Sequence, residues 1–147
     1  MATISGGAKL VARLAELSKN VTKSAELSVG FMSGATYPDG TLVSLVAVVQ
    51  EFGAPSRNVP PRPFFRQSIA RNSGAWPQTA ATLLEANNYD AAKTLSLMGE
   101  GIKGQIQDGI KQVIGPPLKP ATIARKGFST LLIDSSHMLN SVDWKVE

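Results

Sequence analysis

The apolar positions between residues 9 and 18 recur at the spacing of a helix. They form one stripe, which consists of Leu10, Val11, Leu14 and Leu17. Ser5 is a candidate N-terminal cap, and Asn20 is a candidate end of the helix. The pattern therefore predicts an N-terminal helix within residues 1–22.

The following segment changes to a period of two. Between residues 25 and 33, apolar residues alternate with polar residues or glycine, as is typical of a half-buried strand. Residues 41–51 are dense in valine and leucine, and we interpret them as a second strand with apolar residues on both faces. Because Pro38-Asp39-Gly40 has turn chemistry between the two runs, residues 25–51 are predicted to form an antiparallel strand pair.

Residues 52–62 form a proline-rich link, and residues 63–115 return to helical spacing. A break is expected near Ser73, because Pro77 lacks the N–H that a helix interior needs. The most regular stripe predicts a helix over residues 89–114. Its apolar members are Leu95, Met98, Ile102, Ile106, Ile110 and Val113.

Glycines interrupt this long helical pattern. They are Gly99, Gly101, Gly104 and Gly109. Each costs up to about 1 kcal/mol relative to alanine inside a helix. The pattern leaves two interpretations open, either a frayed helix or a helix whose backbone lies very close to its neighbours.

Residues 116–147 are predicted to hold a loop, short helices and a strand. Pro120 begins a short helix through Lys126, and Asp134 or Ser135 is a candidate cap for a brief helix through Asn140. The last seven residues alternate and indicate a strand able to join the sheet of this chain or of a neighbour. The whole chain, 1–147, is thus expected to be one α+β domain. Its small antiparallel sheet is packed with the N-terminal helix and one or two long central helices.

Composition supports a folded chain of ordinary type. Apolar residues make up 43% of the 147 residues and charged residues 18%, which is enough for a core. The absence of cysteine excludes disulfides and thiolate metal sites. No signal-peptide pattern and no apolar run of the roughly 20 residues that span a bilayer is present. The expectation is a soluble protein made in a cytoplasm.

Candidate chemistry is sparse. The one histidine, His137, follows Asp134, Ser135 and Ser136, but catalytic triads are assembled from distant parts of a chain, and this run favours a capped helix start. Carboxylates do not occur at metal-ligand spacing. We therefore predict no enzyme activity, no metal site and no cofactor.

The net charge of +4 and a cluster of arginines near aromatic residues raise nucleic-acid binding as an alternative. The cluster consists of Arg57, Arg62, Arg66 and Arg71, with Phe64 and Phe65 between them. The competing interpretation places Phe65 in the core and the arginines on a solvated rim or against a neighbouring subunit.

The segment EFGAPSRNVPPRPFFR, residues 51–66, carries a specific pattern. It contains Glu51-Phe52-Gly53, then a proline-rich link, then Arg62-Pro63-Phe64 at the expected start of a helix, followed by Arg66. A second pattern lies downstream. It comprises Pro120-Ala121-Thr122-Ile123, Lys126-Gly127, Leu132-Ile133-Asp134-Ser135 and Leu139-Asn140-Ser141.

In order and spacing, residues 41–147 resemble the tail-completion, or head–tail joining, proteins in the neck of long-tailed bacteriophages. Members of that family typically have a strand that ends in Glu-Phe-Gly. The resemblance implies a structural virion protein, made in the host cytoplasm, that forms a homo-oligomeric ring of six or twelve copies. The implied partners are the connector or head-closure protein and a tail-tube or tail-terminator protein. Double-stranded DNA would pass through the lumen without sequence readout, and no membrane is involved. The alternative within virions is a tail terminator that caps the tail tube.

The prolines of residues 51–66 restrict the backbone before assembly, so less entropy is lost on docking. We interpret this segment as a rigid bracket between the sheet edge and a helix. Arg62 and Arg66 suit bidentate pairing with carboxylates across a subunit boundary. The candidate interface residues are Glu51, Phe52, Arg57, Arg62, Phe64, Arg66, Lys126 and Trp144.

Overall fold

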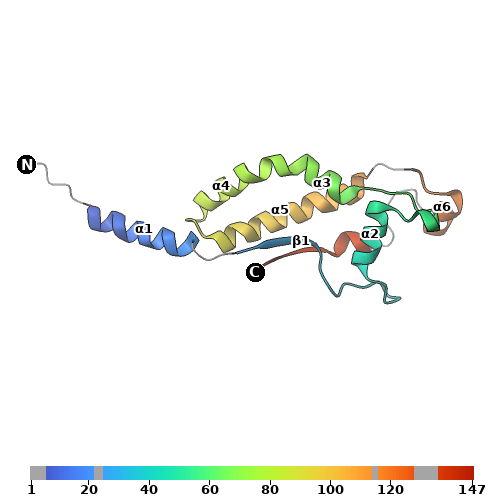
Figure 1. Ribbon diagram of the computed structural model, residues 1–147, viewed down its shortest axis with the longest axis horizontal. Coiled ribbons are helices and arrows are strands. Elements are labelled where there is room, and N and C mark those ends of the chain that lie inside the picture. Colours follow the sequence, from blue (N-terminus) through green and yellow to red (C-terminus); the bar gives the residue numbers. More distant parts are fainter. Residues whose placement is uncertain (1–5, 22–24, 114–115, 128–135) are drawn as a thin grey trace, which may run out of the picture.

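The computed structural model describes residues 6–21, 25–113, 116–127 and 136–147. Its helices are α1 (Gly7–Val21), α2 (Val43–Phe52), α3 (Phe64–Asn72), α4 (Trp76–Ala86), α5 (Ala91–Gln112), α6 (Pro120–Lys126) and α7 (His137–Asn140). Its strands are β1 (Leu27–Phe31) and β2 (Val142–Val146), and short 3₁₀ turns occupy Pro55–Arg57 and Ser73–Ala75. This combination of helices with a small antiparallel sheet confirms the predicted α+β class (Figure 1).

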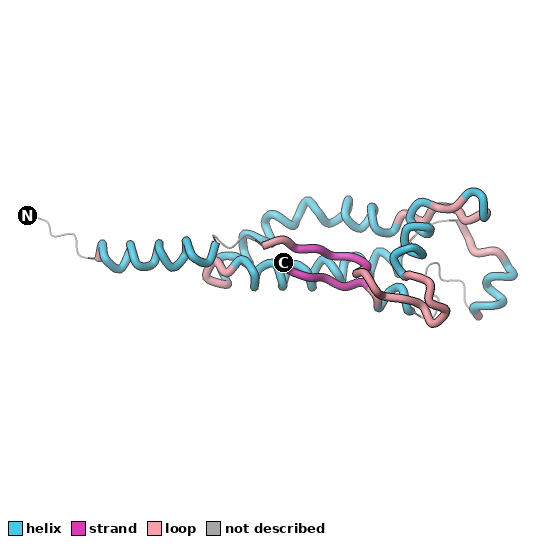
Figure 2. The backbone as a smooth tube through the Cα atoms, turned by 60° about the horizontal axis from the view of Figure 1, so that its bottom comes forward, coloured by secondary structure: helices cyan, strands magenta, loops and turns pink. Residues whose placement is uncertain are grey.

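The sheet pairs the first strand with the last. β1 and β2 are antiparallel, with Leu27 opposite Val146 and Phe31 opposite Val142. The predicted first strand and the predicted terminal strand are therefore confirmed, and the terminal strand joins the sheet of its own chain. Figure 2 shows the two strands side by side, with helices behind them.

The predicted strand over residues 41–51 is wrong, and so is the strand pair over residues 25–51. Residues 43–52 form helix α2, with Val43, Ala47 and Glu51 buried at the four-residue spacing of one helix face. The predicted turn at Pro38-Asp39-Gly40 is present, but it connects β1 to a helix. A helix with apolar residues on two sides has the composition of a buried strand, and this explains the error.

Helix α5 is the centre of the fold. The prediction of a long helix over residues 89–114 is confirmed, since α5 runs from Ala91 to Gln112. The sheet lies on one side of α5, and α3 and α4 lie on the other (Figures 1 and 2). The core gathers residues from every layer: Val43, Ala47, Phe64, Ile106, Ile110, Val113, Met138 and Val142.

Two of the four glycines in α5 explain how closely its neighbours approach. A Cβ added at Gly109 would overlap the hydroxyl of Ser68 in α3, and one added at Gly99 would lie 2.8 Å from the Trp144 ring of β2. Gly101 and Gly104 face open space. The close-approach interpretation is thus confirmed for Gly99 and Gly109 and not for the other two.

Helices α3 and α4 lie within the range predicted as helical, residues 63–115. The expected break near Ser73 is the 3₁₀ turn between α3 and α4. Phe65, predicted to lie in the core, is partly buried against it, whereas Phe64 is the fully buried ring, at 1% exposure. The two rings meet edge-on with centroids 6.2 Å apart. The buried positions of α3 are Phe64 and Ser68, four residues apart on one helix face.

Of the remaining helices, α1 and α6 lie towards the two ends of the molecule (Figure 1). α1 extends from the body (Figure 1), where Arg13 and Asn20 each donate a hydrogen bond to Asn88. α6 begins at Pro120 and ends at Lys126, as predicted. The candidate caps Ser5, Asp134 and Ser135 lie outside the described residues, and α7 begins after Ser136.

Candidate functional site

The proline-rich link folds back on the helix that precedes it. Gly53 ends α2 with a φ of 77°, and a Cβ there would lie 2.9 Å from the backbone nitrogen of Pro61. The N–H of Arg62 then donates to the carbonyl of Gln50 at 2.7 Å. Residues 51–66 therefore bracket two helices, α2 and α3, and the expectation that they connect the sheet edge to a helix is wrong.

Glu51, near the end of α2, binds the start of α3 and so connects the two helices. Its side chain is buried, and its carboxylate accepts hydrogen bonds from the main-chain N–H groups of Phe65 and Arg66. These are orphan donors at the start of α3, where Pro63 offers no side-chain cap. The Arg66 side chain adds an ion pair to Glu51 at 2.7 Å, and its guanidinium lies 4.8 Å from the centre of the Phe52 ring.

Arg62 has a different environment from Arg66, although both belong to the same motif. Arg62 is 7% exposed, and its Nη1 donates to the side-chain oxygen of Gln50 at 3.0 Å. Its Nε is buried and has no acceptor in the part of the chain that the structure describes. Burial in this position lowers the pKa of the Arg62 guanidinium below its ordinary value.

The other predicted interface residues are scattered. Phe64 is part of the core, so its ring does not lie on the surface of the chain. Arg57 is exposed on the 3₁₀ turn of the link. Lys126 is the last residue of α6. Trp144 lies on β2, where its ring packs against Gly99 and its Nε1 donates to Glu100 at 2.8 Å.

The arginines near the link do not form one open basic face. Arg62 is buried, Arg66 pairs with Glu51, and Arg71 donates a long hydrogen bond of 3.4 Å to Gln67. Of the two rings between them, Phe64 is inside the core and Phe65 is partly buried against it.

The outer side of α2 forms an exposed apolar surface that the sequence pattern did not predict. The outer side of α2 carries large apolar residues that are about half exposed: Leu42, which precedes the helix, Leu45, Val48 and Phe52. Their spacing of three and four was the available signal, but it was obscured by interpreting the segment as a strand. We call these four residues the α2 stripe.

The α2 stripe borders a groove beside the sheet. The groove has a volume of about 410 Å³ and is lined by β1, α2 and the start of α3, with Val29, Phe31 and Phe65 among its apolar walls. Since β1 pairs with β2 along one edge only, its other edge carries no strand among the described residues. An apolar helix face beside an unpaired strand edge is a surface suited to a polypeptide partner.

A second uncovered apolar surface lies on α1. No residue of α1 is buried, and four of its large apolar residues are each more than half exposed: Leu10, Val11 and Leu14 of the predicted stripe, and Val21. Figure 1 places α1 at one end of the elongated molecule and α2 towards the other end. The two apolar surfaces therefore cannot cover each other within one chain as it is folded here.

Reactive chemistry does not gather at any of these places. His137 contacts the carbonyl of Thr36 through Nε2 at 2.8 Å and stacks against Tyr37, at 4.8 Å between ring centres. Over the described ranges, no group of three or more metal-ligating side chains is found. Within the same part of the chain, no helix has the length and apolar character to cross a membrane.

Comparison with known proteins finds no relative of this chain. No protein-family model matches the chain, and neither curated proteins nor solved structures include a significantly similar one.

Proposed function

We propose that this chain is a structural virion protein. It would form a ring in the neck of a long-tailed phage and join the capsid connector to the tail. The observation that carries the proposal is the pair of uncovered apolar surfaces, one on α1 at one end of the molecule and one on α2 towards the other end. The motif in residues 51–66 and its downstream companion supply the resemblance to neck proteins.

Two different surfaces towards opposite ends favour a head-to-tail contact between copies. Such a contact closes into a ring when the rotation between neighbours divides a full turn. Large exposed apolar patches are uncommon on monomers and are typical of proteins that assemble. We favour six copies, the symmetry of phage tails, over the twelve of the portal side.

The bracket of residues 51–66 has a clear part in this proposal. Glu51 fixes the end of α2 against the start of α3, so the α2 stripe is held on a rigid base. A rigid surface loses less conformational entropy on assembly than a flexible one. The net charge of +4 is compatible with DNA passing through the ring without sequence readout.

The decisive experiment locates the chain in phage particles. Particles carrying an affinity-tagged copy of this chain would be labelled with gold and imaged by electron microscopy. Label at the junction of capsid and tail is expected. Label elsewhere on the particle, or particles that lack the chain, would refute the neck assignment.

A charged substitution tests whether the α2 stripe makes the ring contact. Leu45→Glu places a charge in the middle of the stripe and is expected to yield separate heads and tails while the purified monomer melts normally. Leu97→Glu is the matched control, because Leu97 is an exposed leucine on α5, outside the stripe. Equal assembly by both variants would exclude the α2 stripe from the contact.

A further inference from the structure

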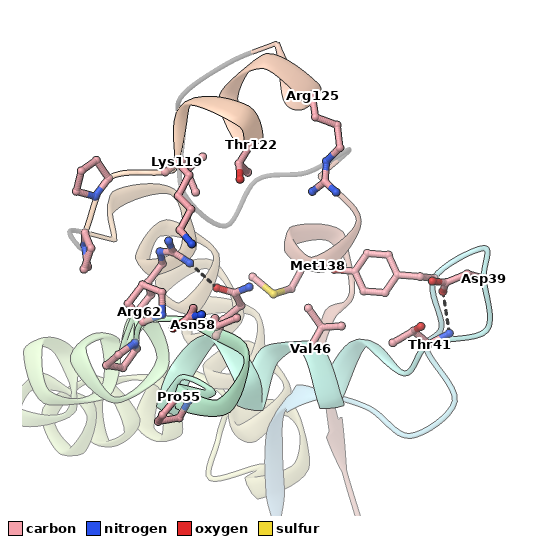
Figure 3. A pocket seen from close by; sticks show the side chains of 18 residues that line it. Asp39, Thr41, Val46, Pro55, Asn58, Arg62, Lys119, Thr122, Arg125 and Met138 are labelled. Atoms are coloured by element: carbon pink, nitrogen blue, oxygen red, sulfur yellow. Dashed lines mark hydrogen bonds between the residues drawn. The ribbon is translucent and has the colours of Figure 1, made fainter.

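A large pocket lies between the proline-rich link and the segment around α6. Its volume is about 1120 Å³, and its walls include prolines from both sides, such as Pro61 and Pro117, together with Val46 and Met138. Figure 3 shows the side chains that line it. The pocket is separate from the groove beside the α2 stripe, because the two have no lining residue in common.

Arg62 is the buried polar group of this pocket. Gln50 accepts from its Nη1, and its buried Nε has no acceptor among the described residues. An arginine stays charged in a protein, and a buried charge without a counter-ion is costly. Arg66, four residues later, has the carboxylate of Glu51 as its partner, whereas no described carboxylate pairs with Arg62.

Two more positively charged side chains line the same pocket. Lys119 and Arg125 line the pocket from the α6 side, and Figure 3 shows Lys119 directed towards the guanidinium end of Arg62. Neither makes an ion pair with any described residue. The acidic residue in the lining is Asp39, whose carboxylate accepts a hydrogen bond from Thr41 at 2.9 Å, and it lies at the far side of the pocket from Arg62 in Figure 3.

We propose that this pocket binds an acidic side chain of a partner polypeptide, whose carboxylate would lie against the positive charge of Arg62 and Lys119. The proline and aliphatic walls suit a polypeptide segment that carries the acid. This inference does not require the neck function, because it concerns a different surface and any acidic protein partner.

The test uses the full chain and two small peptides that differ only in charge. Acetyl-Leu-Glu-Leu-amide and acetyl-Leu-Gln-Leu-amide would be titrated while the Arg62 Nε–H resonance is followed by NMR. The glutamate peptide is expected to shift this resonance saturably and to bind at least about 10-fold more tightly, since charged hydrogen bonds contribute about 1.5–3 kcal/mol. Equal binding of both peptides, or no shift of the Arg62 resonance, would overturn the proposal.

Substitutions at Arg62 and at Arg57 distinguish a specific role of Arg62 from a general effect of positive charge. Arg62→Gln is expected to weaken binding of the glutamate peptide about 10-fold or more, whereas Arg57→Gln is expected to leave it unchanged, because Arg57 is exposed on the same link and does not line the pocket. If Arg62→Gln does not fold, Lys119→Gln replaces it, since Lys119 is exposed, and a several-fold loss is expected.

Competition identifies the source of the anion. Inorganic phosphate and a 20-base-pair duplex would be added to the chain already bound to the glutamate peptide. Retained binding of the peptide supports a carboxylate site. Displacement by either competitor at a lower concentration than the peptide itself would instead define a phosphate site and refute the carboxylate assignment.

Discussion

Glu51 and Arg66 form an ion pair of 2.7 Å that joins the end of α2 to the start of α3. The same carboxylate accepts the N–H groups of Phe65 at 2.9 Å and Arg66 at 3.2 Å. A residue 14 positions away in sequence therefore does what an N-cap residue usually does locally. The negative charge also lies at the positive end of the α3 dipole.

This arrangement predicts a large effect of Glu51→Ala. The change leaves two helix N–H groups without an acceptor, so the free energy of unfolding should fall by about 2–4 kcal/mol. Arg66→Ala is the matched control and should cost only about 1–2 kcal/mol, because the Arg66 side chain is more than half exposed. Urea unfolding of the two variants measures both values. A cost for Glu51→Ala no greater than that for Arg66→Ala would show that capping is not the main role of Glu51.

Substituting alanine for glycine should have opposite effects on stability at two positions in α5. Gly109→Ala should destabilise by about 1–3 kcal/mol, because the new Cβ would overlap Ser68 and lie 3.1 Å from the carbonyl of Phe64. Gly104→Ala faces open space and should stabilise by up to about 1 kcal/mol through helix propensity. Thermal unfolding monitored by circular dichroism checks the signs. A stable Gly109→Ala protein would mean that α3 and α5 do not approach as closely as described.

The sequence predicted the elements whose pattern is local and unambiguous. Residues 89–114 contain several turns of regular apolar spacing, and α5 follows them closely. The period of two gave β1, and the alternating last residues gave β2. The pairing of β1 with β2 joins residues more than 100 positions apart, so no local pattern distinguishes it from a hairpin with residues 41–51.

The errors arose where one local pattern has two physical origins. In α2, Val43 and Ala47 face the core while Leu45 and Val48 face outward, so the helix is apolar on both sides. A buried strand has the same composition, and nothing in the sequence says that one of the two sides is left uncovered.

The candidate site shows the same limitation. The motif predicted Arg62 and Arg66 as equivalent interface residues, but the fold of the link buries Arg62 and leaves Arg66 half-exposed beside Glu51. Four residues of spacing cannot reveal this difference, because it depends on how Gly53 and the prolines return the chain towards Gln50.

The two adjacent phenylalanines make a further prediction. Phe64→Ala should lower the free energy of unfolding by about 3–5 kcal/mol, because the ring is 1% exposed within the core. Phe65→Ala should cost about 1–2 kcal/mol, since that ring is only partly buried against the core. Chemical denaturation of both variants gives the comparison. Equal losses, or the reverse order, would contradict the assignment of Phe64 as the inward ring.

Asp143 predicts how stability depends on pH. A main-chain hydrogen bond from Trp144 and, secondarily, Lys103 at 3.3 Å lower the pKa of the Asp143 carboxyl below its ordinary value of 3.8. A group whose pKa is lower in the folded state stabilises fully above the unfolded pKa, and its contribution is lost as the pH falls through the folded pKa. The free energy of unfolding of the native chain should therefore exceed that of Asp143→Asn at pH 7.

The same reasoning fixes the shape of the pH dependence. The difference between the native chain and Asp143→Asn should stay constant from pH 7 to about pH 5 and shrink as the pH falls below the ordinary carboxyl value. Urea unfolding at pH 7, 5 and 3 measures it. Asp108→Asn is the control for a general charge effect, because Asp108 pairs with Lys111 on the same helix, away from the β2–α5 contact. A gap for Asp143→Asn that does not change between pH 5 and pH 3 would show that the ionised carboxylate contributes nothing to the β2–α5 contact.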